Sequence, residues 1–399
     1  METKLGTSEI VELDYLDLKN GVDLTAKIER AYGTDGTGLL TVKNVPNYIT
    51  ARKRLLPLSR EFSLLPDSIK EKYVHAESYY SFGWSHGKEK LQGKPDVSKG
   101  SYYANPQYDK PVDDEEIIEK YSSFVHPNIW PGEDLPEFEM AFKDLGQIIV
   151  STGKLVARQC DKYVLSKCSS YPPNRLESII DTSICCKARL LHYFPMDSSN
   201  SNGNTADNAE GKGSSESKDR EFSSWCGWHN DHGSLTGLTA AMFLDADGNE
   251  VSNNDPTAGL YIRNRKSELI HVSIPVGNIA FQIGETAQVH SGGLLQATPH
   301  AVRGSKMPQV SRDTYAVFME PNWDEPMTVP PGMDPTSAQS QSAAQNLPAG
   351  VPPLASRWHQ ALPTGASSSS PSPSTPAGAA SESVIDFGQF SENTHKSYY

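Results

Sequence analysis

A change in sequence pattern near Ser183 constrains the possible fold more than any other feature of this 399-residue chain. Beyond Ser183, short apolar runs with β character follow one another: "ARLLHYFP", "LTGLTAAMFLD", "GLYIRN", "ELIHVSIPVG", "NIAFQIGETAQVH" and "DTYAVFME". Gly, Pro, Asn and Asp separate these runs. Such a pattern favours an antiparallel sandwich or barrel over strands that alternate with helices.

Residues 1–183 have a helical pattern instead. Apolar residues recur at helical spacing in "GVDLTAKIERAYGT", and "LPEFEMAFKDLGQIIVSTGKLVARQCDKYV" carries one apolar stripe, with Asp134 as a candidate N-terminal cap. The stripe consists of Phe138, Phe142, Leu145, Ile149, Val156 and Cys160. We therefore predict a mixed α+β fold, in which an N-terminal helical region (1–183) packs its long helix on a β core formed by residues 184–334.

Two polar segments are predicted not to pack. Between Asp197 and Ser224 the apolar residues are two alanines and one phenylalanine, so residues 198–223 are predicted to be a disordered insertion between two strands. Residues 335–383 are rich in Ser, Pro, Ala and Gln, with "PPLASRWHQALP" as the one interruption. This composition predicts a low-complexity linker.

The last segment, residues 384–399, restores apolar density in "SVIDFGQFSENTHKSYY". We expect it to dock on the folded domain, against the N-terminal helices. Ser391 is placed to cap a short helix that runs through Asn393 and Lys396. The alternative is a free tail whose aromatic side chains bind a partner.

Charge and composition restrict the class of protein. The net charge of −13, with no Lys/Arg block, argues against nucleic acid or an anionic membrane as the main partner. No apolar run reaches the ~18 to 20 residues of a membrane helix, and the first residues lack the pattern of a signal peptide. We expect a soluble, cytoplasmic protein. The five cysteines share no C-x-x-C spacing and are expected to be reduced thiols.

The stretch "CGWHNDHGSLTGLT" suggests a metal site. In an extended chain, side chains two residues apart face the same way, so His229 and Asp231 can reach one ion. Two histidines and one carboxylate form the facial triad that binds non-haem Fe(II) and leaves positions open for oxygen chemistry. An isolated H-x-D is more often a chance match or a surface turn. The third ligand must come from elsewhere, and the candidates are His271, His290 and His300.

His300 is the best candidate because Arg312 follows it 12 residues later, in "SRDTYAVF". An arginine on a strand can hold one end of a dicarboxylate through a bidentate pair. Thr314 lies two residues further on, on the same face of such a strand, and adds a hydroxyl donor.

These motifs resemble the 2-oxoglutarate and Fe(II)-dependent dioxygenases of the isopenicillin N synthase-like type. The family's H-x-D strand corresponds to "HNDHGSLT", its distal-histidine strand to "HAVRG", and its R-x-S to Arg312, Asp313 and Thr314. "FQIGETAQVHSGGLLQATPH" is similar to the segment that precedes the family's distal histidine, and "RLLHYFP" to its R-x-N-Y-Y-P strand. The likeness covers about residues 8 to 330.

The resemblance implies a double-stranded β-helix, or jelly-roll, core and an oxidoreductase. His229, Asp231 and His300 would bind Fe(II), while Arg312 and Thr314 would bind the far carboxylate of the co-substrate 2-oxoglutarate. The enzyme would use O2 to hydroxylate or desaturate a small organic substrate, releasing succinate and CO2, with ascorbate as a reductant. We expect a monomer.

In the N-Y-Y-P segment the chain departs from the family pattern at two positions. The family's Asn and second Tyr in N-Y-Y-P are His192 and Phe194 here, while Tyr193 is kept. Tyr193 and His192 are therefore candidates for contacts around the co-substrate. His232 is expected not to be a ligand, and His290 is expected to be a packed or hydrogen-bonded histidine in a strand.

Two other functions stay open at this stage. One is an oxidase resembling isopenicillin N synthase, which uses iron and oxygen without 2-oxoglutarate. The other is a non-catalytic scaffold that has kept the fold. Aromatic residues in "SYYSFGWSHGKEKL" and "KGSYYANP" are expected mostly in the core, with some of them at a substrate pocket.

Overall fold

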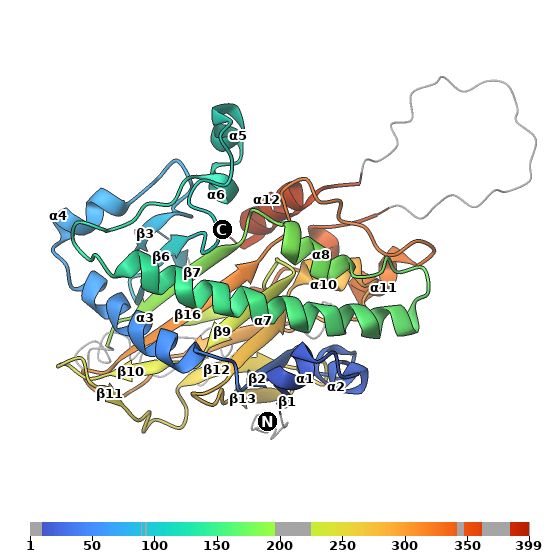
Figure 1. Cartoon of the computed structure of the whole chain (residues 1–399), viewed down its shortest axis with the longest axis horizontal. Coiled ribbons are helices and arrows are strands. Elements are labelled where there is room, and N and C mark those ends of the chain that lie inside the picture. Colours follow the sequence, from blue (N-terminus) through green and yellow to red (C-terminus); the bar gives the residue numbers. More distant parts are fainter. Residues whose placement is uncertain are drawn as a thin grey trace, which may run out of the picture.

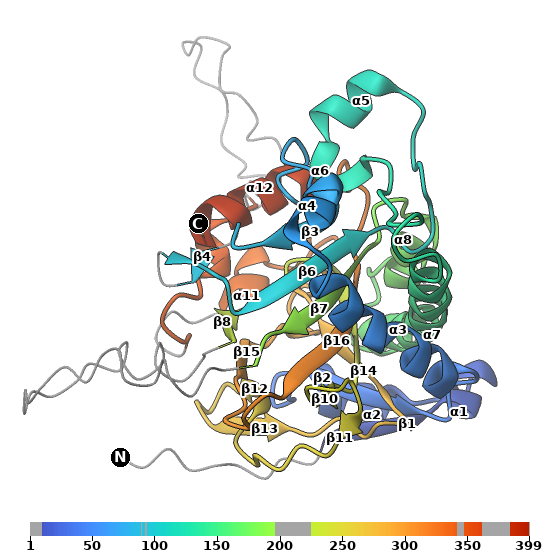
Figure 2. The ribbon, with the colours of Figure 1, turned by 90° about the vertical axis from the view of Figure 1, so that its left-hand side faces the viewer.

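The computed structural model describes residues 10–88, 90–91, 94–195, 225–340, 347–360 and 384–398. A large, mainly antiparallel sheet carries helices on one face and packs its other face against a smaller sheet (Figure 1, Figure 2). The predicted mixed α+β class is confirmed. The insertion expected at 198–223 lies outside the described residues.

Within the described chain, ten strands form the large sheet, in the order β1-β2-β14-β9-β16-β7-β6-β3, with β10 paired to β16 and β11 to β10. The β1–β2 pair is parallel and the other pairs are antiparallel. The strands are β1 (Val11–Asp14), β2 (Leu39–Lys43), β3 (Gly83–His86), β6 (Lys99–Ala104), β7 (Lys187–Tyr193), β9 (Leu235–Thr239), β10 (Met242–Leu244), β11 (Glu250–Val251), β14 (Ile279–Ile283) and β16 (Ser311–Met319).

The smaller sheet is antiparallel, in the order β13-β12-β15-β8. Its strands are β8 (Cys226–His229), β12 (Gly259–Arg263), β13 (Leu269–Val272) and β15 (His300–Arg303), and β4 (Lys90–Leu91) pairs separately with β5 (Lys94–Pro95). The helices are α1 (Tyr15–Lys19), α2 (Thr25–Tyr32), α3 (Tyr48–Ser63), α4 (Asp67–Lys70), η1 (Glu71–Tyr73), α5 (Glu115–Lys120), α6 (Ser122–Val125), α7 (Phe138–Lys167), α8 (Arg175–Thr182), α10 (Glu285–His290), α11 (Pro335–Ser340), η3 (Leu354–Ser356) and α12 (Phe387–Tyr398).

The predicted long helix is α7, which runs across the large sheet beside α3 (Figure 1). All six residues of its predicted apolar stripe are buried. Gly237 on β9 allows the helix to approach, because a Cβ at that position would collide with Ile149. The predicted cap is wrong: α7 begins after Glu137, and Asp134 instead accepts a hydrogen bond from the Tyr73 hydroxyl.

Alternation along β7 divides the interior into two cores. Ala188 and Leu190 pack with α7 on the helix side of the large sheet. Leu191 and Tyr193 belong to a second core, which residues such as Ile262 of β12 complete from the smaller sheet. Successive side chains of a strand point to opposite faces, so a residue's parity on β7 decides which core it joins. The space between the two sheets also receives the candidate site.

The N-terminal region is less helical than predicted. It supplies β1, β2, β3 and β6 to the large sheet, where β2 pairs with β14 and β6 pairs with β7. Short apolar runs such as Leu39–Lys43 satisfy their backbone hydrogen bonds with distant strands, which a search for helical spacing does not detect.

Part of the predicted linker is folded, which corrects the sequence-based expectation. Residues 335–340 form α11, and residues 347–360 pack on the domain, with Leu354 and Trp358 completely buried. The Trp358 indole Nε1 donates to the Met327 carbonyl at 2.8 Å. A few large apolar side chains can thus anchor a segment whose average composition predicts that it does not pack. Residues 341–346 and 361–383 are outside the described chain.

Helix α12 packs beside this segment. Phe387 and Phe390 are completely buried, and Phe387 makes an edge contact with Phe124 of α6, with ring centroids 5.9 Å apart. The proposed Ser391 cap is wrong, because α12 begins one turn earlier, where Asp386 Oδ1 accepts from the Gln389 N–H at 2.8 Å.

Candidate metal centre and co-substrate site

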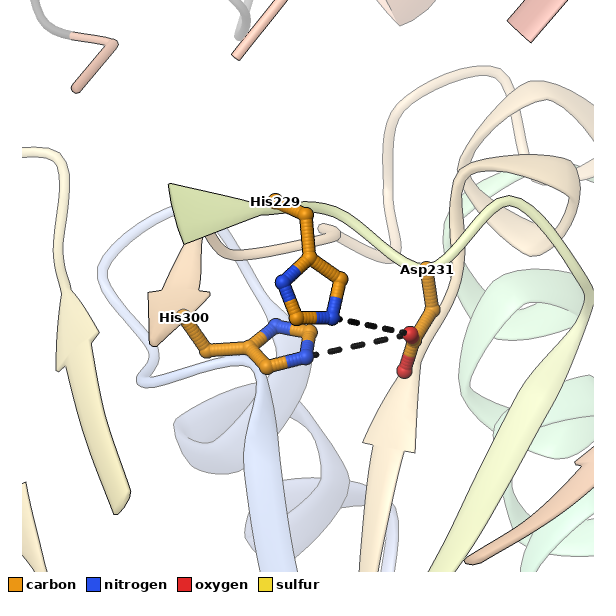
Figure 3. Close-up of side chains that lie close together, drawn as sticks. All are labelled: His229, Asp231 and His300. Carbon is orange, nitrogen blue, oxygen red and sulfur yellow. Dashed lines mark ion pairs between the residues drawn. The ribbon is translucent and has the colours of Figure 1, made fainter. Parts of the chain in front are cut away.

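Strand pairing brings the remote histidine to the H-x-D motif. His229 ends β8, Asp231 lies in the loop that follows, and His300 opens β15, directly opposite His229 in the antiparallel pair. One ligand atom from each of the three residues lies within 4.8 Å of the others. Figure 3 shows the two imidazole rings converging on the Asp231 carboxylate, with Nε2···Oδ1 distances of 3.9 Å from His229 and 3.7 Å from His300.

Hydrogen bonds at the far side of each ring orient the histidines. His229 Nδ1 donates to the Gly227 carbonyl at 2.8 Å, and His300 Nδ1 lies 3.3 Å from the Thr298 carbonyl and 2.5 Å from the Gln282 amide. With Nδ1 engaged in both rings, the Nε2 atoms are left to face Asp231. This is the arrangement that metal-binding histidines use, because the second nitrogen fixes the ring and its tautomer.

The pKa values of the two histidines are pushed apart. Burial disfavours the charged form of His229, but the Cys226 sulfur and the Asp231 carboxylate outweigh it and raise the pKa of His229 to about 9. Burial and the neighbouring His229 lower the pKa of His300 to about 4. A cation that binds both rings therefore has to displace a proton from His229, since only the neutral ring is a ligand.

The other candidate ligands lie elsewhere. His271 Nε2 is 3.1 Å from the Ala258 carbonyl, and its ring stacks on Tyr261. His290 is in α10 rather than in a strand, and its Nε2 donates to the Pro326 carbonyl at 3.0 Å. His232 lies 3.2 Å from the Ser391 hydroxyl and stacks on Phe387.

Arg312 and Thr314 lie on β16, two residues apart, and both are buried. Arg312 is in register with Tyr193 of β7, and its guanidinium lies 5.0 Å from the centre of the Tyr193 ring. The Arg312 Nε has no hydrogen-bond partner among the described residues. Since a buried donor without a partner is costly, this guanidinium is suited to an anionic ligand with matching acceptors.

The structure separates the two residues proposed from "HYFP". Tyr193 faces the space between the sheets and stacks on Trp225 at 5.1 Å. His192 lies in register with Asp313 and contacts its Oδ1 through Nδ1 at 2.8 Å, with both side chains buried. Because β7 alternates, His192 points away from Arg312, so it does not line the candidate co-substrate site.

Two comparisons bear on this arrangement. A family model described as "non-haem dioxygenase in morphine synthesis N-terminal" matches residues 9–133. The full-length T7H of Neurospora crassa, solved with alpha-KG and 5-formyluracil, is similar with a TM-score of 0.58 and 20% identity, over 84% of this chain and 92% of that one. A 2OG-Fe(II) oxygenase family protein from Caulobacter crescentus gives a TM-score of 0.56 and 18% identity, over 81% and 90% of the two chains. The chain has the fold of the 2-oxoglutarate and Fe(II)-dependent oxygenase family.

The fold expected from the resemblance is thereby confirmed, and the family model supports the likeness over residues 9–133. JOX2, solved with 2OG, Fe and JA, also shares the fold, with a TM-score of 0.53 and 17% identity over 86% of this chain and 81% of that one. No curated protein matches the sequence. Among the described helices of this 2-oxoglutarate/Fe(II) oxygenase fold, none is long and apolar enough to cross a membrane.

Proposed function

We propose that the chain is a non-haem Fe(II)- and 2-oxoglutarate-dependent dioxygenase that hydroxylates or desaturates a small organic substrate and releases succinate and CO2. The observation that carries this proposal is the convergence of His229, Asp231 and His300, with both Nε2 atoms directed at one carboxylate oxygen. Two imidazoles and a carboxylate are the donor set that non-haem Fe(II) oxygenases use.

The residues around the candidate site suit both Fe(II) and 2-oxoglutarate. The three candidate ligands come from two paired strands and one loop, and the Nδ1 contacts hold the rings while Nε2 remains directed inward. The buried Arg312, with its unpartnered Nε, fits the far carboxylate of a dicarboxylate. We further propose that the two facing sheets form the family's jelly roll and that Thr314 adds a hydroxyl donor beside Arg312.

Different residues of the chain would then bind the metal, bind the co-substrate and exclude water. His229, Asp231 and His300 would hold Fe(II), which supplies the activation of O2 when it is bound. Arg312 and Thr314 would anchor 2-oxoglutarate, and the Tyr193 ring would form a wall beside the guanidinium. The apolar core between the sheets would exclude water, which strengthens the electrostatic contacts made inside it.

The decisive experiment is a screen for succinate formation with Fe(II), 2-oxoglutarate and candidate substrates, with and without ascorbate. Succinate that rises with a substrate would support the dioxygenase. Substrate oxidation without succinate would favour the oxidase resembling isopenicillin N synthase. A chain that binds no iron would favour the non-catalytic scaffold.

Removing a ligand tests the metal assignment directly. We expect His229→Ala and Asp231→Ala to abolish turnover and to weaken Fe(II) binding by more than the ~10 to 100-fold typical of residues that only orient a ligand. His271→Ala is the matched control, because His271 contacts a backbone carbonyl and Tyr261 instead. Unchanged iron content in both ligand variants, measured on purified protein, would contradict the assignment.

A further inference from the structure

A buried ion pair joins the C-terminal segment to the helix beside the candidate metal centre. The Nη1 and Nη2 atoms of Arg357 each donate at 2.6 Å to a different carboxylate oxygen of Glu285, the first residue of α10. Arg357 and Glu285 are 2% and 1% exposed. Burying two charges costs so much solvation that such a pair is weak evidence for added stability, and a role in fixing one conformation is the better-attested use.

Glu285 connects this pair to the loop that carries the candidate ligand Asp231. Its Oε1 accepts from Asn230 Nδ2 at 3.0 Å, and its backbone N–H donates to the Asp231 carbonyl at 2.8 Å. Thr286 Oγ1 donates to the His232 carbonyl at 2.6 Å. Asn230 stands between His229 and Asp231 in the chain, so the hydrogen bond to its side chain restrains the segment that joins the two candidate ligands.

Several contacts hold the loop between β8 and β9, including the hydrogen bond from the Ser234 N–H to the Met319 carbonyl and the contacts of His232 with α12. β8 ends at His229 and β9 begins at Leu235, so residues 230–234 belong to neither strand. The first turn of α10 adds backbone hydrogen bonds to the carbonyls of Asp231, His232 and Gly233. Glu285 in turn is held by Arg357, whose planar guanidinium fixes the carboxylate in two directions at once.

Contacts with α12 and within residues 347–360 position Arg357. Its Nη1 also donates to the Thr394 hydroxyl of α12 at 3.1 Å, and its carbonyl accepts from Asn393 Nδ2 at 3.1 Å. The neighbouring Trp358 anchors the segment on the domain through the Met327 carbonyl. These contacts fix the position of the Arg357 guanidinium beside Glu285.

We propose that Arg357 and Glu285 are positioning residues for the metal centre: the buried pair fixes Asn230 and thereby sets the directions of His229 and Asp231. The C-terminal segment then contributes to the geometry of the metal centre through Arg357. This inference rests on the proposed function, because it requires that the three ligands bind a metal.

The test measures Co(II) binding to the full chain, by absorption spectroscopy and by titration, with Co(II) as a probe for Fe(II). Asn230→Ala cuts the link to the loop and leaves the ion pair intact. The double variant Arg357→Met/Glu285→Met removes both charges together, so that neither is left buried alone. We expect either change to weaken Co(II) binding about 10 to 100-fold and to alter its absorption spectrum, while the melting temperature of the metal-free protein stays near the wild-type value.

The control is Arg158→Met/Glu177→Met, which removes a partly exposed pair bonded at 2.6 Å between α7 and α8. It should leave the Co(II) spectrum and affinity unchanged. Wild-type spectra and affinities in both Asn230→Ala and the Arg357/Glu285 double variant would overturn the positioning role alone. A wild-type chain that binds no Co(II) would overturn the proposed function, and the positioning role with it.

Discussion

At the scale of single residues, the side chains of consecutive residues on β16 point to opposite faces of the large sheet. Arg312 meets Tyr193 in the space between the sheets, whereas Asp313 pairs with His192 on the other face. The motif R-D-T thus contains two co-substrate candidates and one structural residue. Parity along β16 explains the division, since successive side chains of a strand alternate.

Replacing Arg312 by Lys tests the co-substrate role. The substitution keeps the positive charge but loses the planar fork, so we expect the KM for 2-oxoglutarate to rise about tenfold or more while Fe(II) binding is retained. Steady-state kinetics at varied 2-oxoglutarate concentration, together with iron analysis, provide the measurement. A KM equal to that of the wild type would mean that Arg312 does not bind the co-substrate.

The residues predicted from sequence were those whose roles follow from short motifs. The H-x-D pair and Arg312 could be proposed as candidates because spacing along an extended chain fixes which side chains share a face. The link from Arg357 through Glu285 to Asn230 could not, because its members are 55 and 72 residues apart along the chain. Arg357 also stands in a Ser/Pro-rich stretch, where composition argues against any packed structure.

At the scale of elements, amphipathic helices were easier to predict than strands that complete a sheet. The stripe of α7 is visible in the sequence because its residues recur at helical spacing and all face one core. β2 gains its stability from pairing with β1 and β14, and β14 lies more than 200 residues away. No local pattern contains that information.

Helix α12 offers a test of how firmly the C-terminal segment docks. Phe390 is completely buried in the cluster with Trp358, so Phe390→Ala should lower the free energy of unfolding by about 3 to 5 kcal/mol if α12 unfolds together with the domain. Val384→Ala, at a position that is 46% exposed, is the control and should change little. Urea unfolding measures both, and equal stabilities of the two variants would mean that α12 is not part of the cooperative unit.

At the scale of the whole molecule, the cores enclose ionisable groups as well as apolar ones. His290 in α10 is 1% exposed and packs near Arg175 and Glu325. Burial, reinforced by the positive charge of Arg175, lowers the pKa of His290 to about 3. The folded protein therefore keeps this ring neutral at pH values where the unfolded chain, with an ordinary histidine pKa of about 6.5, binds a proton.

This difference in proton binding predicts that acid destabilises the fold through His290. Above about pH 6.5 neither state binds the proton and the contribution to stability is complete, whereas between pH 6.5 and 3 only the unfolded state binds it. Lowering the pH from 7.5 to 5.5 should thus cost about 1.4 kcal/mol from this residue. In His290→Gln, which has no titrating ring, the loss over that interval should be smaller than in the wild type by this amount.

Urea unfolding of both proteins at the two pH values isolates the effect, because packing changes caused by the substitution appear equally at each pH. Equal losses in the two proteins would mean that His290 is protonated or exposed in the folded state.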